Sequence, residues 1–162
     1  MHGTPIRVDH VGIAVRDAAA AEPLLSVLGC EKLTDREGPD GSFRWVYYRL
    51  GEASRIELVT PLDDEGAIAD FLDRNGPGIH HVTLEVAEMD AVVAAVEEAG
   101  VDVVDYAEHD DYTEAFVSPR NPTGALFQLM EYHDTPEGTT AEEMYVGGQP
   151  VGADGGDSQP ES

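Results

Sequence analysis

Two histidines, one glutamate and one glutamine occupy matching positions in the two halves of this 162-residue chain. The interval from His10 to Glu57 equals the interval from His81 to Gln128. The second pair therefore repeats the first at a constant offset in residue number (71). Two imidazoles, one carboxylate and one amide oxygen suit a divalent first-row metal ion with positions left for water or substrate. The spacing predicts a metal centre to which two equivalent half-sites contribute.

The same offset also aligns longer stretches, which indicates an internal duplication. The aligned segments are 9–15 with 80–86, 28–29 with 99–100, and 55–59 with 126–130. Both histidines lie in stretches of branched apolar residues that predict β-strands. Because successive strand residues point to opposite faces, we expect Asp9 and His80 on the faces opposite their histidine neighbours, with His80 in a supporting or structural role.

Each copy is predicted to fold as a βαβββ unit. In the first copy we expect a strand at 6–15, a helix at 18–28 begun by Asp17 and ended by Gly29, and strands at 43–50 and 55–60. In the second copy we expect a strand at 79–86, a helix at 89–99 ended by Gly100, and strands near 102–105, 112–117 and 125–131. Between the copies, residues 63–75 carry apolar residues at helical spacing. From residue 133 onward the composition predicts a largely disordered tail, in which Tyr145 and Val146 can dock locally.

The composition restricts the partners and the compartment. With 33 acidic and 9 basic residues, the chain has a net charge of −24 and would repel nucleic acid. No apolar run approaches the roughly 20 residues that a membrane-spanning helix needs, and the N-terminus lacks the features of a signal peptide. The single cysteine, Cys30, excludes an internal disulfide. We therefore predict a cytoplasmic protein that binds neither nucleic acid nor membranes.

The acidic excess has two interpretations. One is a cationic partner, and the other is a halophilic protein whose surface is adapted to high salt, where charge repulsion is screened beyond about 3 Å at 1 M. The acidic residues are spread along the chain, which favours the halophilic interpretation. It predicts that the fold loosens in low salt.

Three stretches resemble the methylmalonyl-CoA epimerases of the vicinal oxygen chelate superfamily, which also includes glyoxalases, bleomycin-type resistance proteins and dioxygenases. They are 9–15, 56–62 and 68–81, where a linker helix is followed by Gly78-Ile79-His80-His81. The resemblance covers residues 6–132. It implies an α+β fold in which two βαβββ repeats form a cup-shaped mixed sheet around a metal site. Repeat one spans 6–62, the linker helix 63–76 and repeat two 77–132, and an acidic tail follows at 133–162.

The resemblance also implies a metal-dependent isomerase or epimerase that removes the proton α to a metal-bound carbonyl. His10, Glu57 and His81 would be metal ligands, with Gln128 as a weaker fourth ligand. The ion would be divalent (Co, Mn, Ni, Zn, Mg or Fe), the substrate a small molecule such as an acyl-CoA thioester, and the protein a homodimer. Superfamily members close the two repeats either within one chain or across a dimer, and the sequence is compatible with both.

One position departs from this resemblance. The epimerases usually have glutamate where this chain has Gln128, and an amide can ligate through its oxygen but cannot accept a proton. The catalytic candidates are therefore Glu57, Gln128 and Glu114, the last as a replacement base on the 112–117 strand or, alternatively, a solvent-facing strand residue. The alternative functions are a glyoxalase I-type lyase or isomerase, an extradiol-type dioxygenase with a two-histidine, one-carboxylate iron site, and a non-catalytic protein that binds a small ligand.

Overall fold

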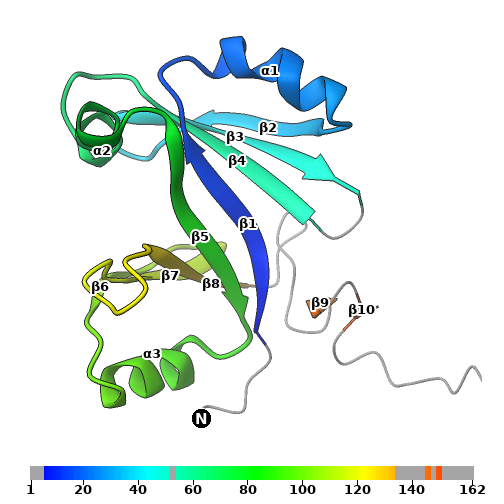
Figure 1. Cartoon of the computed structure of the whole chain (residues 1–162). Helices are drawn as coiled ribbons and strands as arrows, with labels where there is room; N and C mark the ends of the chain where they lie inside the picture. The colour runs from blue at the N-terminus through cyan, green and yellow to red at the C-terminus, as the bar shows by residue number, and fades with distance from the viewer. Residues whose placement is uncertain (1–5, 52–53, 134–144, 147–148, 151–162) are drawn as a thin grey trace, which may run out of the picture.

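Two βαβββ units build one open, eight-stranded mixed sheet in the computed structural model (Figure 1). The structure describes residues 6–51, 54–133, 145–146 and 149–150. The first unit consists of β1 (Ile6–Ala14), α1 (Ala18–Val27), β2 (Glu31–Glu37), β3 (Phe43–Leu50) and β4 (Ser54–Pro61). After the linker helix α2 (Ala67–Asn75), the second consists of β5 (Gly78–Val86), α3 (Met89–Glu98), β6 (Val103–Glu108), β7 (Tyr112–Val117) and β8 (Phe127–Tyr132).

The two repeats join edge to edge within one chain. The strand order is β2-β3-β4-β1-β5-β8-β7-β6, so each repeat contributes four adjacent strands. The central strands β1 and β5 are antiparallel, whereas β1 pairs with β4, and β5 with β8, in parallel. The sheet stays open at both edges. Its curved centre consists of β4 and β1 from repeat one and β5 and β8 from repeat two, which together build the inner face.

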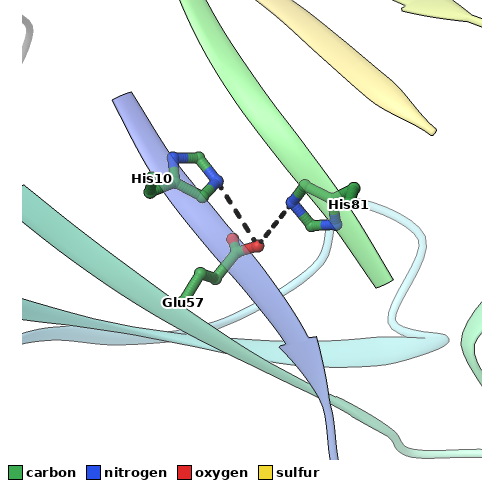
Figure 2. Close-up of side chains that lie close together, drawn as sticks. All are labelled: His10, Glu57 and His81. Carbon is green, nitrogen blue, oxygen red and sulfur yellow. Dashed lines mark ion pairs between the residues drawn. The ribbon is translucent and has the colours of Figure 1, made fainter. Parts of the chain in front are cut away.

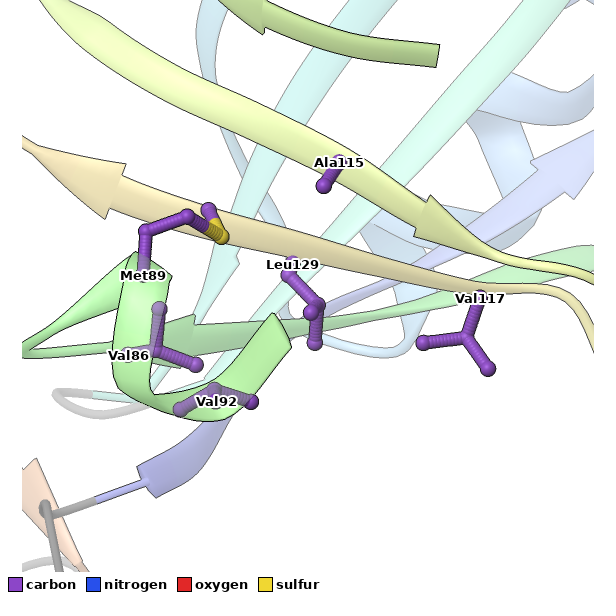
Figure 3. Packing of buried hydrophobic residues seen from close by; sticks show 6 residues of the cluster. All are labelled: Val86, Met89, Val92, Ala115, Val117 and Leu129. Carbon is purple, nitrogen blue, oxygen red and sulfur yellow. The ribbon is translucent and has the colours of Figure 1, made fainter. Parts of the chain in front are cut away.

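Helices α1 and α3 cover the outer face of the sheet, one over each repeat (Figure 1). Under α1, Leu25 packs with Val46 and Leu58. The equivalent cluster under α3, drawn in Figure 3, consists of Val86, Met89, Val92, Ala115, Val117 and Leu129. Burying each large aliphatic side chain contributes about 1.5–3 kcal/mol. Because Leu58 and Leu129 point outward into these clusters, their neighbours Glu57 and Gln128 point into the cup.

The linker helix α2 closes one end of the inner face. Leu72 packs against Ala14 of β1 and Val59 of β4, with Trp45 and Phe71 partly buried beside them. In the described part of the chain, no helix is long and apolar enough to cross a membrane.

The helix boundaries agree closely with the sequence predictions. Asp17 begins α1, because its carboxylate accepts a hydrogen bond of 2.9 Å from the amide of Ala19. Gly29 and Gly100 follow α1 and α3 with φ angles of +86° and +79°, a conformation that favours glycine. The predicted disordered tail lies mostly outside the described residues, which include only β9 (Tyr145–Val146) and β10 (Gln149–Pro150) beyond residue 133.

Candidate metal centre

Three strands bring two histidines and one glutamate together on the inner face of the sheet (Figure 2). His10 comes from β1, Glu57 from β4 and His81 from β5, and all three are buried. Glu57 Oε2 lies 3.1 Å from His81 Nε2 and 3.6 Å from His10 Nε2. Donor atoms that bind one ion at about 2.1 Å lie roughly 3.0 to 3.4 Å apart. One of the two distances falls in this range and the other slightly exceeds it, and all three donor atoms lie within 4.8 Å of one another, so these side chains could hold a single ion after a small adjustment.

The two ring nitrogens of His81 differ in their hydrogen-bond partners. His81 Nε2 is buried and has no hydrogen-bond partner among the described residues. Its other nitrogen, Nδ1, lies 2.9 Å from His80 Nδ1. Burial and the neighbouring His81 lower the pKa of His80 to about 4, so His80 is neutral and can accept the hydrogen of His81 Nδ1. In this tautomer the lone pair of His81 Nε2 would be available to a metal ion, and the donor set of two imidazoles and one carboxylate fits a divalent cation.

The residues before the two histidines do not lie on the opposite face, which corrects the sequence prediction for Asp9 and His80. The pairing of β1 with β5 shifts register between Val8 and His10, and again between Gly12 and Ile13. The first shift makes Asp9 an extra residue on β1, and the second makes His80 an extra residue on β5. Such bulges redirect a side chain. As a result, Asp9 Oδ2 lies 2.7 Å from His10 Nδ1, just as His80 contacts His81.

The centre combines a stable anion with a readily protonated imidazole. Burial alone would raise the pKa of Glu57, but His10 and His81 lower it to about 2. Burial opposes a charge on His10, yet the contacts with Asp9 and Glu57 outweigh burial and raise the pKa of His10 above its usual value. A metal ion that binds His10 Nε2 must take the place of a proton there, so binding releases protons.

Gln128 is connected to the histidines through a threonine that the sequence analysis did not single out. Thr83 donates a hydrogen bond of 2.7 Å to Gln128 Oε1. Because the Thr83 hydrogen is used in this way, its oxygen accepts from His10 Nε2 at 2.9 Å. The amide oxygen of Gln128, predicted to be a fourth ligand, is therefore bound to Thr83.

Glu114 faces the same region from β7. Its Oε2 accepts a hydrogen bond of 2.8 Å from Gln128 Nε2, and its Oε1 lies 3.1 Å from His109 Nε2. The Glu114 side chain is only 20% exposed. Glu114 is therefore partly buried and is connected to His10 through Gln128 and Thr83, while its role as a base stays a prediction.

Gly12 provides the space in which His81 lies. A Cβ atom at this position would be 2.1 Å from His81 Cε1, far closer than atoms approach without a shift. A glycine inside a strand is a sequence signal for close approach of another group. Gly12 could have been found in this way, whereas Thr83 gave no such signal.

Comparison with known proteins identifies relatives of this chain. The family model described as Glyoxalase/Bleomycin resistance protein/Dioxygenase superfamily matches residues 9–116. The chain is 33% identical over 131 residues to an ethylmalonyl-CoA/methylmalonyl-CoA epimerase of Cereibacter sphaeroides, covering 77% of this chain and 97% of the relative.

Solved structures of epimerases share the fold. Methylmalonyl-CoA epimerase from Mycobacterium tuberculosis superposes with a TM-score of 0.70 at 32% identity, covering 78% of this chain and 87% of that structure. A variant of the Streptomyces coelicolor methylmalonyl-CoA epimerase, in complex with 2-nitronate-propionyl-CoA, gives a TM-score of 0.70 at 26% identity, covering 80% and 96%.

Proposed function

This chain belongs to the glyoxalase/bleomycin resistance protein/dioxygenase superfamily, and from that membership and the geometry of its site we propose that it is a metal-dependent epimerase of methylmalonyl-CoA or a similar branched acyl-CoA thioester. The observation that carries the proposal is the convergence of His10, Glu57 and His81, to which Glu114 is connected through Gln128 and Thr83. A divalent ion held by the three ligands would polarise the thioester carbonyl and make the adjacent C–H more acidic.

The structure supports Glu114 as the base that removes the α proton. Gln128 cannot accept a proton, but its amide nitrogen donates to Glu114 Oε2 at 2.8 Å and fixes the orientation of that carboxylate. A base positioned in this way contributes about 10²- to 10⁴-fold to proton transfer. Glu57 is held as an anion, so it would have to take a proton from water before it could return one to the substrate from the other side.

The two carboxylates come from opposite repeats. Trp45 pairs with Val59, and Glu114 pairs with Met130. Since Val59 and Met130 occupy matching positions in the duplicated sequence, Trp45 is the counterpart of Glu114. The counterpart of Glu57 is Gln128. Each repeat thus supplies one carboxylate from a different strand, an arrangement that suits proton removal and return on two faces of the substrate.

Deuterium exchange tests the proposal. In deuterated water, the metal-loaded protein is expected to incorporate deuterium at the α carbon of both stereoisomers of methylmalonyl-CoA, and a chelator should stop the reaction. Glu114→Gln should slow the exchange of one stereoisomer by at least about 100-fold without changing metal affinity. Glu108→Gln is a matched control, because Glu108 is an exposed residue on the same β6–β7 hairpin.

Two outcomes would overturn this function. Absence of exchange with metal bound would exclude the epimerase reaction. Oxygen-dependent ring cleavage of a catechol by the iron-loaded protein, without thioester exchange, would identify the dioxygenase instead, because two histidines and one carboxylate also suit iron.

A further inference from the structure

A buried cluster of charged side chains lies beside His10 and connects it to both repeats. Its centre is Asp9, which is 1% exposed. Asp9 Oδ2 lies 2.7 Å from His10 Nδ1 and accepts a hydrogen bond of 3.1 Å from the hydroxyl of Tyr132. Asp9 Oδ1 forms ion pairs with Arg7 and with Arg55. Both oxygens of the carboxylate therefore have fixed partners.

From this arrangement we infer that Asp9 is a positioning residue for His10, and that Arg55 and Tyr132 hold Asp9 in place from the two repeats. The inference rests on the proposed metal centre. A carboxylate that accepts the hydrogen of Nδ1 confines the lone pair to Nε2, the nitrogen that faces Glu57. In metal sites, partners of this kind fix the ring orientation and the tautomer of the ligand.

Arg55 and Tyr132 come from strands on either side of the central pair. Arg55 lies on β4 in repeat one, and Tyr132 ends β8 in repeat two. Their side chains meet over β1, where Arg55 Nη2 lies 3.3 Å from the Tyr132 hydroxyl and the guanidinium carbon lies 5.8 Å from the centre of the ring. The last strand of repeat two thus helps to set the position of a ligand in repeat one.

The inward orientation of the Asp9 side chain follows from the bulge in β1. A regular strand would direct Asp9 to the outer face, toward the apolar clusters under the helices. With the bulge, Asp9 and His10 both face inward, and Arg55 has a buried anion to pair with. Ion pairs with Arg7 and Arg55 and the hydrogen bond from Tyr132 favour the carboxylate form of Asp9, which can then accept the hydrogen of His10 Nδ1.

Asp9→Asn is the sharpest test, because an amide can turn its NH₂ group toward His10 and favour the wrong tautomer. Zinc affinity, measured by calorimetry, should fall about 10- to 100-fold, as for other partners of metal-bound histidines. In the zinc-loaded protein, long-range ¹H–¹⁵N spectra should show that His10 is protonated at Nδ1 in the unaltered chain. In the variant, the ¹⁵N signals of His10 should shift because its tautomer or ring orientation changes. Neither readout depends on enzymatic activity.

Glu85→Gln is the matched control. Glu85 is also 1% exposed and forms an ion pair of 2.5 Å with the same Arg7, but it has no contact with His10. Its substitution should leave zinc affinity within about twofold of the unaltered protein, well below the effect expected at Asp9. If Asp9→Asn does not fold, Tyr132→Phe removes only the hydroxyl that contacts Asp9 and should lower zinc affinity by roughly three- to tenfold.

The outcomes separate this inference from the proposed function. Unchanged zinc affinity and an unchanged His10 spectrum in the folded Asp9 variant would overturn the positioning role, as would equal losses in the Asp9 and Glu85 variants. If only Tyr132→Phe can be measured, unchanged zinc affinity in that variant would also overturn the positioning role. Failure of the unaltered protein to bind any divalent ion would overturn the metal centre and the inference with it, whereas zinc binding without thioester exchange would overturn the epimerase alone.

Discussion

The two half-sites place equivalent histidines at equivalent points but support them with different chemistry. Asp9 contacts His10 Nδ1, and its counterpart in repeat two, His80, contacts His81 Nδ1. In each case a bulge turns the preceding residue toward the ligand. One histidine is thus backed by a carboxylate and the other by a neutral ring. The duplicated fold has kept the geometry of support while the supporting groups have diverged.

A second difference concerns the space around each histidine. Gly12 makes room for the ring of His81, whereas its counterpart Thr83 fills the equivalent space and contacts His10 through its hydroxyl. The same divergence separates Glu57 from Gln128. An ancestral two-fold site with identical halves would treat both faces of a substrate alike. The present differences give the cup two distinct sides.

The largest expected effect comes from filling the space at Gly12. In Gly12→Ala, the new methyl group would collide with the His81 ring, so zinc affinity should fall by at least about 100-fold, the upper end for residues that orient a ligand. Thr83→Ala, the equivalent change in repeat two, creates no collision and should alter affinity by less than about tenfold. Calorimetric titration with zinc measures both. Similar losses in the two variants would show that the half-sites are equally constrained.

A smaller effect is expected from Glu85, a buried carboxylate with no acidic counterpart at the matching position of the other half. Glu85 lies in β5, and its counterpart in β1 is Ala14, which packs against α2. Burial raises the pKa of Glu85 from 4.5 to about 7 despite its ion pair with Arg7. An acid whose pKa is raised on folding stabilises the protein fully below its unfolded pKa, and this contribution is lost as the pH rises through the folded value.

Replacing Glu85 with glutamine removes that dependence on pH. The stability of Glu85→Gln relative to the unaltered protein should therefore increase as the pH rises from about 4.5 to about 8. Urea unfolding of both proteins at several pH values gives this difference, in which the titrations of all other groups largely cancel. A difference in stability that stays constant with pH would mean that Glu85 titrates normally in the folded chain.

The three side chains of the candidate centre could be predicted from the sequence because they depend on simple regularities. The constant offset between the copies identified His10 and His81, and with them Glu57 as the counterpart of Gln128. The helix ends at Gly29 and Gly100 followed from local backbone preferences. These features depend on the residues themselves and their immediate neighbours.

The supporting groups could not be predicted, because they depend on how strands pair. Whether Asp9 faces inward is decided by a register shift against β5, a strand that begins only after the whole of repeat one and the linker helix. Likewise, Glu114 reaches Gln128 only because β7 and β8 pair so that Glu114 lies opposite Met130. Pairing register over such distances is set by the whole sheet, and a one-residue change reverses every side chain.

The smallest expected effect concerns charge, which also differs between the halves. Repeat one has nine acidic and seven basic residues, whereas repeat two has twelve acidic residues and Arg120 as its one basic residue. In repeat one, Lys32 and Arg49 form exposed ion pairs of 2.5 Å with Glu22 and Glu31. Such pairs strengthen as salt is removed, while the repulsion within repeat two grows.

Removing salt should therefore loosen the two halves unequally. Repulsion extends over about 10 Å at 0.1 M salt but only about 3 Å at 1 M. Amide hydrogen exchange followed by mass spectrometry should show strands β6–β8 losing protection at low salt before β2–β4 do, with the shared strands β1 and β5 least affected. Magnesium ions, which bind carboxylates, should restore protection at lower ionic strength than sodium does. Equal loss of protection in both repeats would show that the acidic surface acts on the molecule as a whole, and no loss in either would contradict adaptation to high salt.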